Sequence, residues 1–198
     1  MKLLLATTSG GKIREQQASL ADVDGLDVEL VTLESWPELD PPEEPGPSFL
    51  DNAIAKALYY HRATGLLAVG EDSGLVIDAL GGEPGIRSAR WLGEDTPYDI
   101  KNAHVLEKLS DVAEDDRRAR YVSAVALADG DAIVFTSEGI CEGQIATAPR
   151  GDGGFGYDPI FFYPPFGATM AELSAELKNR VSHRGQAMAK LRAFLAAR

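Results

Sequence analysis

The alternation of short apolar runs with helical segments constrains the fold of this chain most strongly. Residues 2–6 form an apolar run typical of a buried strand, and residues 12–21 have apolar side chains at helical spacing. A strand joined to a helix by a short turn is the building unit of α/β folds. Residues 121–128 and 132–136 instead flank Asp-Gly-Asp, a typical hairpin turn. Because helix crossovers and hairpins both occur, the sequence predicts a mixed α/β fold.

Start and stop signals predict two further helices. Ser48 followed by Asp51 resembles a capping box, and Gly65 is a typical stop for the helix that begins there. Thr96 is an expected N-cap, with Pro97 as the first residue of a helix that runs to residue 109.

The other segments complete the expected pattern. Residues 28–33 alternate as a second strand, and residues 66–69 and 75–80 are predicted strand segments interrupted by Glu-Asp-Ser-Gly. Residues 35–47 are acidic and rich in proline, which predicts a loop. A last helix is expected over residues 182–197.

The size and charge of the chain exclude several classes of protein. Its 198 residues are enough for one domain, or for two small lobes that share a core. Lys and Arg total 19 against 31 Asp and Glu, a net charge of −12 that repels nucleic acids and anionic membrane surfaces. No apolar run approaches the ~20 residues that span a bilayer, and no secretory signal is expected. The single cysteine, Cys141, suits a reducing cytoplasm.

The turn after the first predicted strand has the composition of a phosphate-binding loop. It combines hydroxyls, two glycines and a lysine, and its residues are Thr7, Thr8, Ser9, Gly10, Gly11 and Lys12. Backbone N–H groups at a helix N-terminus bind anions, and glycine lets an anion approach the backbone. The Gly–Lys spacing differs from that of a Walker loop. An ordinary start of a helix is the alternative interpretation.

Two adjacent carboxylates lie between apolar strand segments, at Glu71 and Asp72, and Ser73 follows them. Unpaired carboxylates are costly to bury, and neighbours in a strand point to opposite faces. A carboxylate at such a position can bind Mg²⁺ or accept a proton from water. Glu43 and Glu44, on the preceding loop, are candidates to complete a metal site. A solvated turn is the alternative for the pair.

A glycine-rich segment, RGDGGFGYDPIFF, occupies residues 150–162. Its four glycines make a poor core strand but a good binding loop, and Phe155 offers a flat face for stacking a base. Further on, Lys178, His183 and Arg184 place hydrogen-bond donors around the start of the last helix. Together they are typical of a site for an anion or a carbonyl group, although a lone histidine there is more often a capping or packing residue.

Five stretches, in order, carry a resemblance to a known family: ATTSGGK, SFLDNAIAKA, EDSGLVIDALGGEPGIRSARW, GDGGFGYDPIFF and AELSAELKNRVSHRGQA. They cover the chain nearly end to end and resemble the inosine triphosphate pyrophosphatase family, the non-canonical purine NTP pyrophosphatases. The resemblance implies one two-lobed α/β domain over residues 1–198, with a long mixed sheet flanked by helices and a deep central cleft. It also implies a cytoplasmic homodimer.

The implied activity is Mg²⁺-dependent hydrolysis of dITP, ITP or XTP to the monophosphate and pyrophosphate, which cleanses the nucleotide pool. Such an enzyme is a hydrolase acting on acid anhydrides, and its partner is a free nucleotide. Two alternatives are a related pyrophosphatase with another nucleotide preference and a non-catalytic nucleotide sensor. Intact Asp72, Lys12 and Glu44 argue against a sensor.

The resemblance also assigns roles by position. Residues 7–12 become the phosphate-binding loop, and Glu44 and Asp72 the metal ligands. Asp72 is also the expected proton acceptor for the attacking water, and Ser73 contacts substrate. The base pocket is assigned to Phe155, which stacks, and to Gly156, Tyr157, Asp158, Lys178, His183 and Arg184.

The chain departs from the family pattern at three positions. Ser9 stands where Asn is usual, Glu71 where many members have Asp, and Trp91 where Tyr or Phe is commoner.

Purine discrimination follows from hydrogen-bond chemistry. Donors from Lys178, His183 and Arg184 would pair with the 6-oxo group of hypoxanthine or xanthine, whereas the 6-amino group of adenine would face other donors. An unpaired buried polar group costs about 1–3 kcal/mol, so each mismatch gives roughly ten- to hundredfold rejection.

Overall fold

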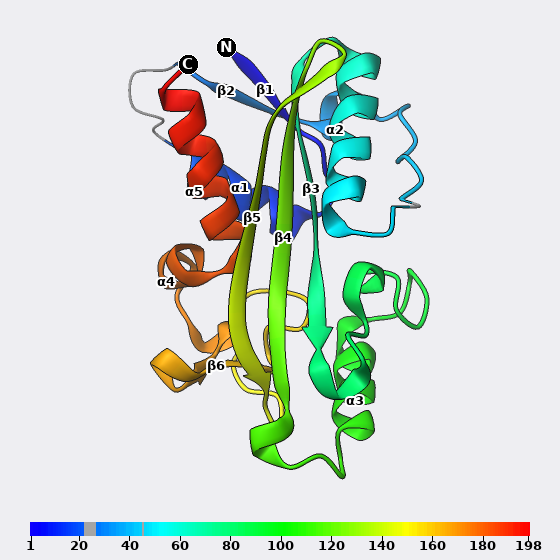
Figure 1. Ribbon diagram of the computed structural model, residues 1–198, viewed down its shortest axis with the longest axis vertical. Helices are drawn as coiled ribbons and strands as arrows, with labels where there is room; N and C mark the ends of the chain where they lie inside the picture. The colour runs from blue at the N-terminus through cyan, green and yellow to red at the C-terminus, as the bar shows by residue number, and fades with distance from the viewer. Residues whose placement is uncertain (22–26, 45) are drawn as a thin grey trace. The chain divides into compact units, whose positions relative to one another are not determined.

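The computed structural model describes residues 1–21, 27–44 and 46–198, and within them it forms one seven-stranded sheet (Figure 1). The strand order is β2-β1-β3-β4-β5-β6-β7. The strands are β1 (Lys2–Leu5), β2 (Glu29–Thr32), β3 (Leu67–Ile77), β4 (Arg118–Asp129), β5 (Ala132–Ile145), β6 (Phe161–Tyr163) and β7 (Ala168–Thr169). β1 pairs in parallel with β2 and β3, whereas β6 pairs antiparallel with β5 and β7. The predicted mixed sheet is confirmed.

Helices and short 3-10 turns connect the strands. The α-helices are α1 (Gly10–Leu20), α2 (Phe49–Thr64), α3 (Tyr98–Lys108), α4 (Ala175–Val181) and α5 (His183–Ala196). The 3-10 helices are Leu33–Ser35, Asp78–Leu80, Gly85–Arg87, Glu114–Asp116, Pro164–Phe166 and Met170–Glu172. Among the described residues, none of these helices has the length and apolar character that crossing a membrane requires.

The chain divides into two compact units. Unit 1 comprises residues 1–72, 123–139 and 183–198, and unit 2 comprises residues 73–122 and 140–182. The line between them falls inside β3, directly after Asp72.

Unit 1 has helices on both faces of its strands (Figure 1). Leu3 and Leu5 of β1 pack with Leu20 of α1 and with apolar residues of α5, because alternate side chains of a strand point to one face. Leu4 points to the other face and packs with Tyr60 of α2. Each face of β1 therefore buries apolar surface, as its unbroken apolar run predicts.

Close backbone contact fixes α2 against β3. A Cβ atom on Gly70 would lie 2.1 Å from the carbonyl oxygen of Ala53 and 2.6 Å from the backbone nitrogen of Ala57. Only glycine fits there, and the two residues that follow Gly70 on β3 are Glu71 and Asp72.

Unit 2 has its own apolar core. It includes Leu75 and Ile77 of β3, Val105 of α3, and Ile160 and Phe161 from the end of the glycine-rich segment.

The predicted start and end signals of α2 are both confirmed. Ser48 is the N-cap of α2 and accepts a hydrogen bond from the Asp51 backbone N–H at 3.1 Å, and Gly65 ends the helix in the left-handed conformation at φ 71°. For α3 the prediction of Thr96 as N-cap is wrong. Pro97 is the N-cap and not the first helical residue, since α3 begins at Tyr98, and the Thr96 hydroxyl donates to the Leu92 carbonyl at 2.6 Å.

Other predictions need correction. β3 is one strand from Leu67 to Ile77, not two segments interrupted at residues 71–74. The last helix starts at His183, since Ser182 is the C-cap of α4, a helix that the sequence did not predict. The predicted loop over residues 35–47 has no α-helix or strand among its described residues, and Pro45 lies outside them.

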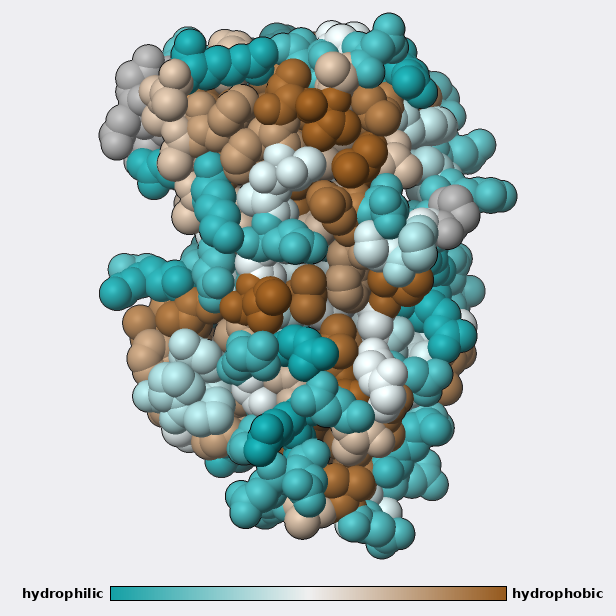
Figure 2. Space-filling model, in the orientation of Figure 1, coloured by the Kyte–Doolittle hydropathy of each residue, from teal (hydrophilic) through white to brown (hydrophobic). Residues whose placement is uncertain are grey.

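The surface carries both polar and apolar residues. On the face drawn in Figure 2, hydrophilic side chains are interspersed with hydrophobic ones. Ile100, Ile140 and Phe166 are among the exposed large hydrophobic residues.

Candidate active site

Glu71 lies at the centre of a buried ion cluster in unit 1. Its side chain is inaccessible, with Oε2 2.9 Å from the Lys12 ammonium and Oε1 3.1 Å from Nε of Arg184. Oε1 also accepts a hydrogen bond from the Ser123 hydroxyl at 2.8 Å. Burial acts to raise the pKa of Glu71, but Arg184 and then Lys12 outweigh it and hold that pKa well below its usual range. Glu71 is therefore an anion that joins α1, β3 and α5.

Asp72 points to different partners, as the alternation of a strand predicts. Its Oδ2 accepts a hydrogen bond from Nδ2 of Asn52 at 3.0 Å, and its Oδ1 lies 3.5 Å from the Lys56 ammonium. Burial raises the pKa of Asp72, although Lys56 and Lys12 act to lower it. A carboxylate with a raised pKa is a stronger base, so Asp72 suits a role as proton acceptor.

Lys56 of α2 contacts two carboxylates and one backbone carbonyl, and the sequence motifs did not single it out. Its ammonium lies 2.5 Å from Oε1 of Glu44 and donates to the Glu71 carbonyl at 3.2 Å, besides its contact with Asp72. Burial acts to lower the pKa of Lys56, but Asp72 and Glu44 together raise it. The ammonium is therefore a fixed positive charge in an acidic cluster.

Asn52 was also missed, although both residues lie in the stretch SFLDNAIAKA. Asn52 is fully buried, and its Oδ1 accepts a hydrogen bond from the Gly46 backbone N–H at 2.9 Å. Residues four apart share one face of a helix. The spacing of Asn52 and Lys56 was the signal that could have placed both beside the predicted acids.

The structure distinguishes the two candidate glutamates on the loop before α2. Glu44 is half-buried and makes the contact with Lys56, whereas Glu43 is exposed. Glu44 is thus the residue brought to the cluster, as the resemblance implies.

Glu44 and Asp72 are suitable residues for a magnesium site. In residues 1–21, 27–44 and 46–198 no group of three or more His, Cys, Asp or Glu is arranged to hold a metal. Mg²⁺ does not require one, because it commonly binds through one or two carboxylates together with substrate phosphates and water. Glu44 and Asp72 both contact the Lys56 ammonium, so the two carboxylates lie beside the charge of one side chain within unit 1.

The predicted phosphate-binding loop is ordered by its own hydroxyls. Ser9 is the N-cap of α1, and its side chain accepts from the Lys12 backbone N–H at 3.5 Å. The Ser9 N–H in turn donates to Oγ1 of Thr7 at 3.2 Å. Thr8 and Gly10 are exposed, and the first turn of α1 has no acidic residue. Serine at position 9 therefore serves as the N-cap of α1.

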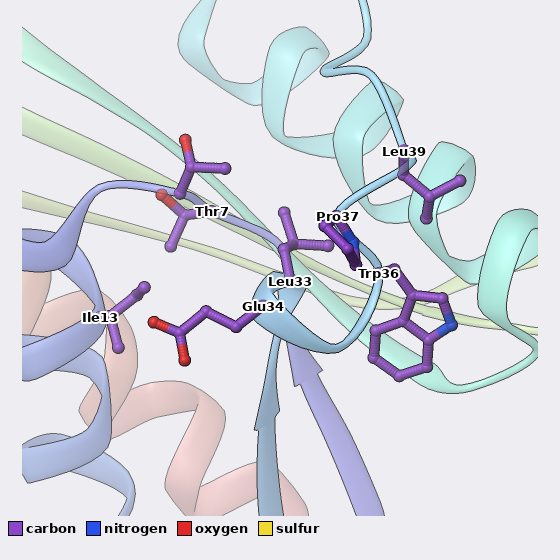
Figure 3. A pocket seen from close by; sticks show the side chains of 8 residues that line it. Thr7, Ile13, Leu33, Glu34, Trp36, Pro37 and Leu39 are labelled. Atoms are coloured by element: carbon purple, nitrogen blue, oxygen red, sulfur yellow. The ribbon is translucent and has the colours of Figure 1, made fainter.

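A cavity of about 190 Å³ lies beside this loop (Figure 3). Its lining residues are Thr7, Thr8, Ile13, Leu33, Glu34, Trp36, Pro37 and Leu39. In Figure 3 the carboxylate of Glu34 points toward Ile13.

His183 and Arg184 begin α5, and both are buried. Besides Glu71, Arg184 forms an ion pair with Glu15 of α1. A Cβ atom on Gly139 would lie 2.0 Å from the His183 carbonyl oxygen, so glycine permits the close approach of β5 to the first turn of α5. These two predicted base-pocket residues belong to unit 1.

Asp158 organises the glycine-rich segment in unit 2. Its Oδ2 accepts a hydrogen bond from the Phe155 backbone N–H at 2.7 Å and lies 2.5 Å from the Lys178 ammonium. The Tyr121 hydroxyl donates to its Oδ1 at 3.3 Å. Burial and then the charge of Asp158 raise the pKa of Tyr121 well above its usual value, which keeps that hydroxyl a donor. Asp158 thus fixes the backbone of the glycine-rich segment at Phe155.

Phe155 and Lys178 lie together at this loop. The Lys178 ammonium is 4.7 Å from the centroid of the Phe155 ring, a cation–π contact. The ring is half-buried, so part of it remains accessible for stacking.

Tyr157 is more enclosed than the prediction of a pocket residue implies. It is 2% exposed, and its hydroxyl donates to the Ser88 carbonyl at 2.9 Å. Its ring packs edge-on against Tyr98 with centroids 5.2 Å apart. Tyr157 supports the loop from behind.

The predicted residues therefore fall into two sets. Unit 1 holds residues 7–12, Glu44, Asp72, His183 and Arg184, and unit 2 holds Ser73, residues 155–158 and Lys178. Ser73 is half-buried and follows Asp72 on β3.

Comparison with known proteins identifies the family. The sequence model of the Ham1 family matches residues 3–194. The chain belongs to the Ham1 family. This confirms the resemblance stated from the sequence motifs, because many curated relatives of this Ham1 chain carry the name dITP/XTP pyrophosphatase.

Individual relatives match over nearly the whole length. The dITP/XTP pyrophosphatase of Geobacter sulfurreducens is 45% identical over 194 residues, which cover 98% of this chain and 96% of the relative. That of a Thermus thermophilus strain is 47% identical over 197 residues, which cover 100% of this chain and 91% of the relative.

Solved structures of Ham1 proteins share the fold. A HAM1 protein from Coxiella burnetii matches with a TM-score of 0.89 and 37% identity, covering 100% of both chains. A nucleoside-triphosphatase described as a dITP/XTP pyrophosphatase, from Mycobacterium abscessus, matches with a TM-score of 0.76 and 42% identity, covering 98% of this chain and 100% of the other.

Proposed function

We propose that this Ham1 protein hydrolyses the non-canonical purine nucleoside triphosphates dITP, ITP and XTP to the monophosphate and pyrophosphate. Relatives 45% and 47% identical over almost the full chain are named for dITP and XTP. The observation in the chain itself that supports catalysis is the pairing on β3 of Glu71, an anion held by Lys12 and Arg184, with Asp72, whose pKa is raised.

The proton acceptor for the attacking water is Asp72. Its raised pKa brings it closer to the value that favours proton transfer near neutral pH. Asn52 holds one carboxylate oxygen through its hydrogen bond, which orients the other oxygen. Asp72 is thus fixed in place before substrate arrives.

Lys12 and Lys56 provide the positive charge that stabilises the phosphates. Cleavage between the α and β phosphates develops charge on the pyrophosphate leaving group, and fixed cations stabilise that charge. Lys12 lies in the first turn of α1, where the N-terminus of the helix adds its own attraction for an anion.

Mg²⁺ is part of the proposal, with Glu44 and Asp72 as the residues that would hold it. When bound, it would neutralise phosphate charge and polarise the reacting phosphoryl group.

Base recognition is assigned to Phe155, His183 and Arg184, with Lys178. Phe155 provides the stacking face, and the other three provide donors for a 6-oxo group. Asp158 fixes both Phe155 and Lys178, so the aromatic face and one donor are positioned by the same carboxylate.

The homodimer, the central cleft, the cytoplasmic location and the exclusion of nucleic acids stay predictions. The net charge of −12 supports the last of these, since it repels long polyanions from a site for free nucleotides.

The test separates an enzyme from a nucleotide sensor. ITP is incubated with purified protein in Mg²⁺ or in excess chelator, and pyrophosphate and orthophosphate are measured separately. The proposal requires pyrophosphate and IMP with Mg²⁺ and a large loss of turnover with chelator. Binding of ITP without hydrolysis would make the protein a sensor.

A further inference from the structure

Helix α3 carries a buried side-chain amide that contacts the glycine-rich segment at residues 150–162. Asn102 is 6% exposed, and its Nδ2 donates a hydrogen bond to the Gly156 carbonyl at 3.2 Å. Only the amide N–H can pair with a carbonyl oxygen, so this contact fixes which way the amide faces. A residue from a separate helix therefore holds the backbone between Phe155 and Tyr157.

The backbone at Gly156 needs such support. Gly156 has φ 71°, in the left-handed region that glycine adopts easily and that leaves it many alternatives. Asp158 fixes the Phe155 N–H, on one side of Gly156, and the Tyr157 hydroxyl is held by Ser88 on the other. The Asn102 bond fixes the Gly156 carbonyl, and the Phe155 carbonyl accepts a hydrogen bond from the Asp158 backbone N–H at 3.3 Å.

A second residue of α3 supports the same loop through apolar contact. Tyr98 packs edge-on against Tyr157, and a Cβ atom on Gly156 would lie 3.6 Å from the Tyr98 ring. Tyr98 and Asn102 are four residues apart, so they share one face of α3. That face presents one apolar and one polar contact to the loop.

The other end of the Asn102 amide gains nothing from burial. Among the described residues, Oδ1 has no hydrogen-bond partner and is inaccessible to solvent. An unpartnered buried acceptor is destabilising, and an apolar side chain would avoid that cost. Residues that break a stability rule in this way tend to serve a site.

We infer that Asn102 is a positioning residue that sets the orientation of the Phe155 stacking face through the Gly156 carbonyl, and so sets purine selectivity. The inference rests on the proposed function, and it identifies Asn102 as the residue that positions part of the proposed base pocket. Asn102 acts on nucleotide affinity and on the choice between 6-oxo and 6-amino purines. Lys12 and Asp72, which belong to unit 1, carry the phosphate chemistry.

The experiment compares Asn102→Asp with the unmodified protein. The substitution keeps the size of the side chain but places a carboxylate oxygen against the Gly156 carbonyl. Steady-state kinetics with ITP and ATP give KM, kcat and the ITP/ATP ratio of kcat/KM. Glu107→Gln is the matched control, since its side chain lies on the same helix and is 82% exposed.

We expect Asn102→Asp to raise KM for ITP and to lower the ITP/ATP ratio by about tenfold each, as the loss of one buried hydrogen bond predicts. The kcat for ITP stays within about twofold, and Glu107→Gln changes none of these quantities. A fall in kcat for both nucleotides with an unchanged ratio would overturn the inference and leave Asn102 a purely structural residue.

Thermal unfolding identifies a variant that fails to fold. Asn102→Ala, which removes both amide atoms and adds no charge, then replaces the aspartate variant under the same criteria. IMP affinity, measured by calorimetry, separates the two proposals. If the unmodified protein does not hydrolyse ITP, the proposed function fails. A tenfold loss of IMP affinity in the variant still supports the role of Asn102 in that case. An unchanged IMP affinity refutes that role.

Discussion

The ammonium of Lys56, on α2, lies 2.5 Å from a carboxylate oxygen of Glu44, on the loop before that helix. The same ammonium reaches Asp72 at 3.5 Å. One lysine therefore contacts both proposed metal ligands and offsets part of their combined negative charge. Replacing Lys56 tests how its charge affects the pKa of Asp72 and the rate of the reaction.

Lys56→Met should lower kcat for ITP by roughly a hundredfold, because a buried charge that stabilises developing negative charge is lost. It should also raise the pKa of Asp72, since Lys56 is the cation that lowers it most. The acidic limb of the kcat/KM profile then moves to higher pH. Lys2→Met, at a surface ion pair with a side chain 58% exposed, is the control. An unshifted acidic limb would show that Lys56 does not set the pKa of Asp72.

Asp72→Asn should reduce kcat by about 10²–10⁴-fold, the range for loss of a general base. The amide oxygen can still accept the hydrogen bond from Asn52, whereas the ion pair with Lys56 is lost. ITP affinity, measured by calorimetry without turnover, should change little. Near-normal kcat would show that another group accepts the proton.

Glu71 should make stability depend on pH. Its pKa in the folded protein is depressed, so its contribution is complete above its unfolded pKa of about 4.3 and is lost as the pH falls through the folded value. Removal of one partner from a buried ion cluster costs about 3–5 kcal/mol. Glu71→Gln should therefore lower the free energy of unfolding by that order at pH 7.

The comparison at low pH provides the check. The difference between Glu71→Gln and the unmodified protein should shrink in urea titrations as the pH falls below about 4. A difference that stays constant with pH would mean that the charge of Glu71 does not carry the stabilisation.

The helix boundaries of unit 1 can be predicted from local sequence, whereas the partners of its buried charges cannot. The Ser48 cap and the Gly65 stop of α2 depend on residues within one turn, so both could be predicted. The continuity of β3 could not. Glu71 and Asp72 read as a break because two buried carboxylates are unfavourable alone. The groups that neutralise them come from α1, α2 and α5, far away in sequence.

In unit 2, Phe155 and Asp158 could be predicted to form a binding loop from the glycines around them. The enclosure of Tyr157 depends on Ser88 and Tyr98, and the role of Asn102 depends on a hydrogen bond across 54 residues. Such contacts are set by tertiary packing and leave no local signal.

Gln16→Leu should stabilise the protein. Gln16 of α1 is fully buried, and within the described part of the chain neither of its amide atoms has a hydrogen-bond partner. Leucine has a similar volume and avoids the cost of two unpaired polar atoms, so the free energy of unfolding should rise by about 1–3 kcal/mol. Gln17→Leu, at the exposed neighbouring position, should change it by less than about 0.5 kcal/mol. A destabilised Gln16→Leu variant would show that the amide makes necessary bonds.

The preference for dITP and XTP is tested most directly by measuring kcat/KM for dITP, XTP, dATP, dGTP and dTTP side by side. Each reaction contains Mg²⁺, and the release of pyrophosphate is the readout. We expect kcat/KM for dITP and for XTP to exceed that for dATP by roughly ten- to hundredfold for each mismatched hydrogen bond. Equal or faster turnover of dTTP or dATP would contradict it.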